Sequence, residues 1–163
     1  MAEIRKIHKK PYRQRKDYSE RINAIKRLIE YLRDLDDNFP KNIKKAMLGH
    51  AIWQVTVANG DYTPKFRSEG VINGKLGTKI QREHIFEMEK IKDNILSKKW
   101  RDFEELWDFI LPRMIHCVVT ADNEHKRLLH GDGKIDGLSR YKEAGIKVWD
   151  CSKEPPELLK EIR

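Results

Sequence analysis

The stretch IHCVVTADNEH, residues 115–125, decides the fold of this chain. Its first half is apolar and β-branched, which is typical of a buried strand, and its second half is polar and opens a helix. A second fragment, QREHI at residues 81–85, places a carboxylate beside an imidazole at the end of a short polar strand. If the two fragments meet in space, a carboxylate and two imidazoles converge at one corner of the molecule.

Helices are expected on both sides of these fragments. Apolar residues recur three and four positions apart in residues 19–35 and 40–59, which predicts two helices packed as an antiparallel hairpin. Residues 60–77 are rich in glycine and polar side chains, which indicates a long loop or short extended pieces. The remaining predicted elements are a strand at 79–83, helices at 85–96 and 102–110 (the second closed by Pro112), a strand at 114–119, helices at 121–129 and 139–144, a strand at 146–149 and a terminal helix at 156–162.

These elements predict an α+β fold that is mainly helical, with the N-terminal helix hairpin packed on a small ββα-like element. At 163 residues the chain has the length of one compact domain. We therefore expect a basic flexible arm over residues 1–18 and a single domain over residues 19–163.

The overall charge narrows the class of partner. The formal net charge is +8, so attraction to phosphates or acidic surfaces is expected. No apolar run is long enough for a signal peptide or a membrane span, which favours a cytoplasmic protein without a membrane partner. The two cysteines form no CxxC site, and Cys117, in a β-branched strand, is expected to be a buried reduced thiol.

Basic side chains gather in two places that could contact nucleic acid. The candidates lie in the N-terminal arm and in the loop over residues 60–77: Lys9, Lys10, Arg13, Arg15, Lys65 and Arg67. Such residues position a protein on the phosphate backbone. The alternative, a solvated tail and an ordinary solvated loop, remains open.

Three polar residues of the predicted helix at 121–129 could do chemistry. Asp122 and His125 lie three positions apart, so they share one helical face and could offer an oxygen and a nitrogen to the same ion. Asn123 lies on another side and is better placed to orient an imidazole. His130 could join them only if the helix ends before it. Helix capping by Thr120 or Asp122 is the competing explanation of this motif.

The order of a strand ending in Glu-His, a second strand and a helix with Asn and His resembles the ββα-metal motif of HNH-type nucleases. The resemblance covers residues 79–130. It implies that His84 is the general base, that Glu83 and His125 hold one divalent metal ion (Mg²⁺, Mn²⁺ or Zn²⁺), and that Asn123 orients the base. The sequence departs from the family pattern because two predicted helices separate the half-motifs and because Asn123 and His125 are unusually close in sequence.

Three functions are compatible with these residues. The first is a metal-dependent endonuclease that hydrolyses phosphodiester bonds of nucleic acid, with DNA favoured, in which His84 activates water and the metal ion stabilises the phosphate. The second is a non-catalytic basic nucleic-acid-binding protein of the phage or mobile-element type. The third is a protein-interaction module whose basic surface meets an acidic partner.

Overall fold

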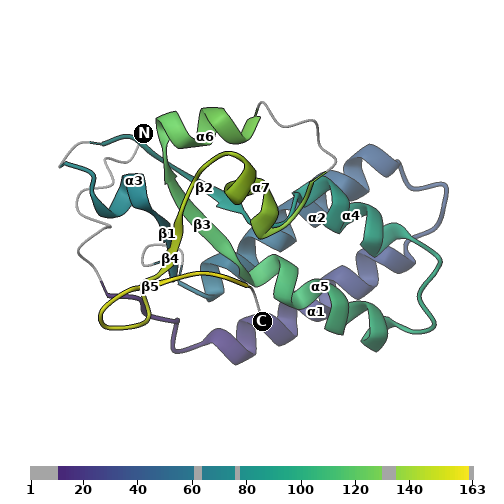
Figure 1. Cartoon of the computed structure of the whole chain (residues 1–163). Coiled ribbons are helices and arrows are strands. Elements are labelled where there is room, and N and C mark those ends of the chain that lie inside the picture. Colours follow the sequence, from purple (N-terminus) through teal and green to yellow (C-terminus); the bar gives the residue numbers. More distant parts are fainter. Residues whose placement is uncertain (1–10, 61–63, 76–77, 130–134, 162–163) are drawn as a thin grey trace.

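The computed structural model of this chain describes residues 11–60, 64–75, 78–129 and 135–161 (Figure 1). Within these ranges the chain forms seven helices and one five-stranded sheet. The expected class, α+β and mainly helical, is confirmed. The helices α1, α2, α4 and α5 gather at one end of the molecule, and the sheet with α3, α6 and α7 forms the other (Figure 1).

The N-terminal hairpin consists of α1 (Tyr18–Asp34) and α2 (Lys41–Ala58). The apolar residues that predicted α1 are buried at helical spacing, because one stripe of the helix packs against the rest of the core. Pro40 precedes α2, where its missing N–H costs no helical hydrogen bond. The predicted hairpin is therefore confirmed within one or two residues at each boundary.

Two further helices complete the helical core: α4 (Met88–Leu96) and α5 (Phe103–Ile115). The prediction that Pro112 ends the second helix is wrong, since α5 continues through it to Ile115. A proline inside a helix leaves a carbonyl of the preceding turn without its donor. The carbonyl that lacks its donor here is that of Asp108, four residues before Pro112. The Arg113 guanidinium donates to the next carbonyl oxygen, that of Phe109, at 2.6 Å.

The sheet has the strand order β2-β3-β1-β4-β5. Its strands are β1 (Phe66–Ser68), β2 (Ile80–His84), β3 (Cys117–Ala121), β4 (Val148–Asp150) and β5 (Glu157–Leu158). The β1 and β3 strands pair in parallel, and the other neighbours are antiparallel. Every residue of β3 is buried, because this strand lies inside the sheet and is covered on both faces.

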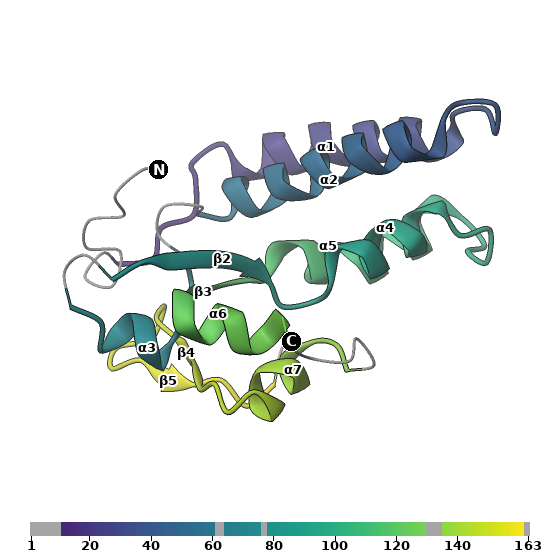
Figure 2. The ribbon, with the colours of Figure 1, turned by 90° about the horizontal axis from the view of Figure 1, so that it is seen from above.

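The two faces of the sheet meet different elements. Figure 2 shows the α1/α2 hairpin on one side of β2 and β3, and α6 (Asp122–Leu129) with α7 (Leu138–Glu143) on the other. A small apolar cluster fills the α7 side and is separate from the helical core; it consists of Phe66, Ile85, Val118, Leu128, Tyr141, Ile146 and Val148. The sheet thus divides the molecule into two environments.

Several predicted boundaries are corrected by long-range pairing. The expected loop at 60–77 contains β1 and the short helix α3 (Glu69–Ile72), which form because β1 pairs with β3 and β4. The helix expected from Ile85 begins at Met88, since the Ile85 N–H donates to the His116 carbonyl instead. The expected terminal helix at 156–162 is wrong, because Glu157 and Leu158 add the edge strand β5 to β4.

Two further expectations concern the chain as a whole. Cys117 is a free buried thiol, as expected, and burial raises its pKa to about 12. In the part of the chain that the structure describes, no helix has the length and apolar character needed to cross a membrane.

Candidate functional site

The pairing of β2 with β3 sends Glu83 and His84 to opposite faces of the sheet. Glu83 lies opposite Val118 and His84 opposite Cys117, so both residues still belong to the regular ladder. Successive side chains of a strand point to opposite faces. The expectation that Glu83 and His84 serve one site is therefore not met, because His84 still belongs to the strand.

Glu83 points to the side of α6 and α7, where it meets two basic side chains. One carboxylate oxygen contacts His125 Nδ1 on α6, and the other lies 3.3 Å from Arg140 Nη2 on α7. The Glu83 side chain is only 11% exposed, so these interactions are screened less than surface ion pairs. The structure thus brings together Glu83 and His125, the two residues expected to hold a metal ion.

The corner between β3 and α6 explains why His125 reaches Glu83. The α6 helix begins directly after Ala121, and the Asp122 N–H donates to the Lys79 carbonyl at 3.0 Å. Gln81 and Glu83 share one face of β2, and Asp122 and His125 share one face of α6. Asp122 interacts with Gln81 and His125 with Glu83, so the helix lies along the strand.

Asp122 does not join the Glu83–His125 contact. Its carboxylate lies 2.9 Å from Lys126 Nζ, and the hydrogen bond with Lys126 lowers the pKa of Asp122 below its usual value. The second candidate on this helix, Asn123, is exposed, whereas His84 is buried on the other side of the sheet. The structure therefore does not support Asn123 as the residue that orients His84. His130 lies outside the described residues.

A residue that sequence reasoning missed, Glu124, fixes α6 in place. Its buried carboxylate accepts hydrogen bonds from the N–H groups of Ala121 (2.9 Å) and Gly70 (3.0 Å), and from the Ser68 hydroxyl. A carboxylate near a helix start is also stabilised by the helix dipole. A Cβ at position 70 would lie 2.7 Å from the Glu124 carboxylate, so a larger residue there would force this carboxylate to shift. The signal available in the sequence was Glu124 in the first turn of the helix.

Arg140 and Tyr141 complete the surroundings of Glu83. They belong to α7, which follows Gly137, a glycine with φ of 69°. Tyr141 is fully buried in the apolar cluster. Burial, and next the negative charge of Glu83, raise the pKa of the Tyr141 hydroxyl well above its usual value, so it remains a proton donor.

His84 lies in a contrasting environment beside α2. Its Nε2 is 2.8 Å from the Thr56 hydroxyl, and its ring packs 4.3 Å from the Trp53 ring, centroid to centroid. Burial lowers the pKa of His84 from 6.5 to about 4. A neutral imidazole that is 6% exposed and bonded to Thr56 has a structural role. The His84 side chain lies on the opposite face of the sheet from that of Glu83. The expected role of His84 as general base is not supported by this position.

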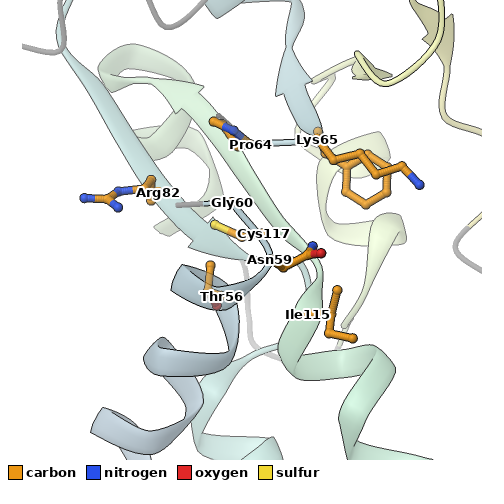
Figure 3. A pocket seen from close by; sticks show the side chains of 9 residues that line it. Thr56, Asn59, Gly60, Pro64, Lys65, Arg82, Ile115 and Cys117 are labelled. Carbon is orange, nitrogen blue, oxygen red and sulfur yellow. The ribbon is translucent and has the colours of Figure 1, made fainter. Parts of the chain in front are cut away.

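A small hollow also lies on the α2 side of the sheet. Figure 3 shows it between the end of α2, with Thr56 and Asn59, and the strand residues Arg82 and Cys117. Neither Glu83 nor His125 lines it. Since the Cys117 thiol holds its proton firmly, the hollow brings no reactive group to the candidate site.

The donor set of the candidate site suits a loosely held ion. An imidazole nitrogen and a carboxylate oxygen from two elements are in contact, and both are atom types that bind divalent ions. Among the residues that the structure describes, no group of three or more His, Cys, Asp or Glu side chains could hold a metal. Mg²⁺ and similar ions keep several waters and take further oxygens from substrate phosphates. Glu83 and His125 therefore fit a substrate-assisted ion and do not form a closed structural metal site.

The candidate nucleic-acid contacts have different positions. Arg67 is buried, its Nε donates to the Pro64 carbonyl at 3.2 Å, and burial lowers its pKa. Arg67 is therefore a core residue in this structure. Lys65 is half-buried and lies 3.5 Å from Asp150. Arg13 and Arg15 are exposed, with Arg15 bonded to Asp17 at 2.9 Å. Lys9 and Lys10 lie outside the described residues.

Comparison of the chain with protein-family models, curated proteins and solved structures gives no match.

Proposed function

We propose that this chain is a metal-dependent endonuclease that hydrolyses phosphodiester bonds of nucleic acid, with DNA favoured. The observation that carries the proposal is the contact between Glu83 of β2 and His125 of α6, made beside Arg140. The resemblance to HNH-type nucleases implies the same two residues as metal ligands. A chain with net charge +8 also attracts a polyanionic substrate.

Each side chain of the site has a distinct task in this proposal. Glu83 and His125 hold a divalent ion, which, when bound, stabilises negative charge on the phosphate and makes a water more acidic. Arg140 adds a planar cation that can pair with two phosphate oxygens. The Glu124 carboxylate keeps α6, and so His125, in register with β2.

His84 takes no proton in the proposed reaction. Its Nε2 is engaged with Thr56 on the opposite side of the sheet, and its pKa of about 4 leaves it a weak base. The proposal therefore keeps the expected metal ligands and gives up the expected base.

Cleavage of supercoiled plasmid by the purified protein tests this function. Mg²⁺, Mn²⁺ and Zn²⁺ are supplied separately, and EDTA is expected to stop the reaction. Glu83→Gln should lose most cleavage, because the amide carries no charge for the ion. Glu143→Gln is the matched control, since Glu143 is an exposed acid of α7 outside the site. Cleavage that persists in EDTA and in Glu83→Gln rules the proposal out.

The second candidate function is a non-catalytic basic nucleic-acid-binding protein, for example from a phage or mobile element. The observation that favours it is that the described residues supply only two adjacent metal donors. It predicts binding that weakens steeply with salt and ignores chelator. Deletion of residues 1–16 should then remove most of the affinity, whereas a deletion without effect contradicts this candidate.

The cellular location belongs to the same proposal. The free thiols Cys117 and Cys151 suit a reducing compartment, so we place the activity in the cytoplasm. A substrate inside the cell, such as DNA, is compatible with that location.

A further inference from the structure

The carboxylate of Glu83 is shared between two basic side chains, one on each of its oxygens. His125 Nδ1 contacts Oε1, and Arg140 Nη2 lies 3.3 Å from Oε2. The Arg140 side chain is 16% exposed, so the pair is largely withdrawn from water. Glu83, the residue proposed to bind the ion, thus contacts one basic side chain of α6 and one of α7.

A divalent ion and Arg140 compete for this carboxylate. The charge of Glu83 can balance one neighbouring cation well, and a second cation close by is repelled in a site of low dielectric. An ion bound by Glu83 and His125 therefore weakens the hold on Arg140. A released guanidinium next to a phosphate-binding ion would itself seek phosphate oxygens.

Tyr141 supplies a second observation at the same place. Its hydroxyl is fully buried and makes no hydrogen bond to any residue that the structure describes. Leaving a buried donor unpaired is unfavourable. After burial, the negative charge of Glu83 has the largest effect on this hydroxyl, and the two carboxylate oxygens of Glu83 contact His125 and Arg140. Departure of Arg140 would free an acceptor for Tyr141, which lowers the cost of the rearrangement.

We propose that Arg140 is a phosphate-binding residue held in reserve by Glu83, and that a divalent ion taken up by Glu83 and His125 releases it to the nucleic-acid backbone. The inference rests on the proposed function and deepens it, because it names the residue that senses the ion and contacts substrate. Ion binding and backbone binding are then coupled through one carboxylate.

Binding of a fluorescein-labelled phosphorothioate oligonucleotide, measured by anisotropy in EDTA and in Ca²⁺, tests the coupling without measuring cleavage. Wild type should bind about tenfold more tightly with Ca²⁺. Glu83→Gln should bind tightly even in EDTA, because the amide no longer holds Arg140. Arg140→Ala should show no gain from Ca²⁺, and its binding should depend on salt with a slope lower by about one.

The double variant Glu83→Gln/Arg140→Ala tests whether Glu83→Gln binds more tightly because Arg140 is released or only because a negative charge is lost. It should bind as weakly as Arg140→Ala, and a double variant as tight as Glu83→Gln overturns the proposal. Glu143→Gln, which removes an exposed acid of the same helix, should behave like wild type. Arg140→Lys keeps the charge without the planar fork and serves if Arg140→Ala does not fold.

The two proposals fail separately. If Ca²⁺ tightens oligonucleotide binding through Arg140 but the protein cleaves with none of the metals, the release of Arg140 stands and the nuclease proposal is refuted. If the protein cleaves in a metal-dependent way but the effects of Glu83→Gln and Arg140→Ala on binding free energy simply add in the double variant, the release of Arg140 is refuted and the nuclease proposal stands. Absence of binding by all proteins removes both.

Discussion

Glu83 and His84 are sequence neighbours on one strand, yet they lie in opposite environments. Glu83 faces α6 and α7, where it contacts His125 and Arg140. His84 faces α2, where Thr56 and Trp53 cover it. The carboxylate keeps basic partners and some access to solvent, whereas burial removes water from the imidazole and lowers its pKa. In this molecule the side of the sheet, more than the residue type, determines which group is available for chemistry.

The largest expected difference between the two faces is in catalysis. His125→Ala should lower metal-dependent cleavage at least about 1,000-fold, because loss of a ligand itself exceeds the 10–100-fold typical of its supporting groups. His84→Gln should cut at close to the wild-type rate, since its amide can still pair with Thr56. Single-turnover rates on plasmid measure both. An inactive His84→Gln variant together with an active His125→Ala variant would place the catalytic group on the His84 face of the sheet.

The next effect is on stability and follows from the pKa of His84. The unfolded chain takes up a proton near pH 6.5, while the folded chain resists protonation of His84 until about pH 4. Stability is therefore complete above pH 6.5 and falls as the pH drops through this window, by about 3 kcal/mol for this residue. Urea unfolding at several pH values should show a shallower loss for His84→Gln. Identical pH dependence in the two proteins would contradict burial of the neutral ring.

A smaller loss of stability is expected on substitution of Thr56, a residue of α2 that bonds to α5 and to β2. Its hydroxyl donates to the Met114 carbonyl at 3.2 Å and lies 2.8 Å from His84 Nε2, so it accepts the His84 N–H. Thr56→Val leaves both groups unpaired and should cost about 1–3 kcal/mol of unfolding free energy. Thr56→Ser keeps the hydroxyl and should cost less. Equal losses for Val and Ser would assign the effect to packing alone.

The smallest effect is expected at Tyr141, on the Glu83 side. Because its buried hydroxyl is unpaired among the described residues, Tyr141→Phe should change the unfolding free energy by less than about 1 kcal/mol, in the stabilising direction if at all. Chemical denaturation in EDTA measures it. A loss of several kcal/mol would show that the hydroxyl is bonded in solution and would weaken the case for release of Arg140.

Much of the fold was predictable because it rests on local patterns. Helical spacing of apolar residues gave the α1/α2 hairpin, and the change from β-branched to polar residues located the corner between β3 and α6. The alternation of side chains along a strand already placed Glu83 and His84 on opposite faces. What could not be read was whether the strand ended before His84, because that depends on its pairing with Cys117.

The rest of the site depends on residues distant in sequence. Nothing near Glu83 signals that Arg140 will approach it, and nothing near Glu124 signals that Ser68 and Gly70 will hold it. The strand β1 was hidden in an expected loop, because three residues carry little pattern and owe their structure to neighbours in the sheet. Tertiary pairing also overrode the local preference that suggested a terminal helix where β5 forms.

The position of β1 in the sheet has a consequence for how the molecule assembles. β1 lies between β3 and β4, so it cannot be fully paired until Asp150 has joined the folding chain. The α1/α2 hairpin needs only contacts close in sequence, which form quickly. During synthesis we therefore expect the helical hairpin to form early and the sheet to be completed late, while Arg140 joins Glu83 and His125 only after α7 has been made.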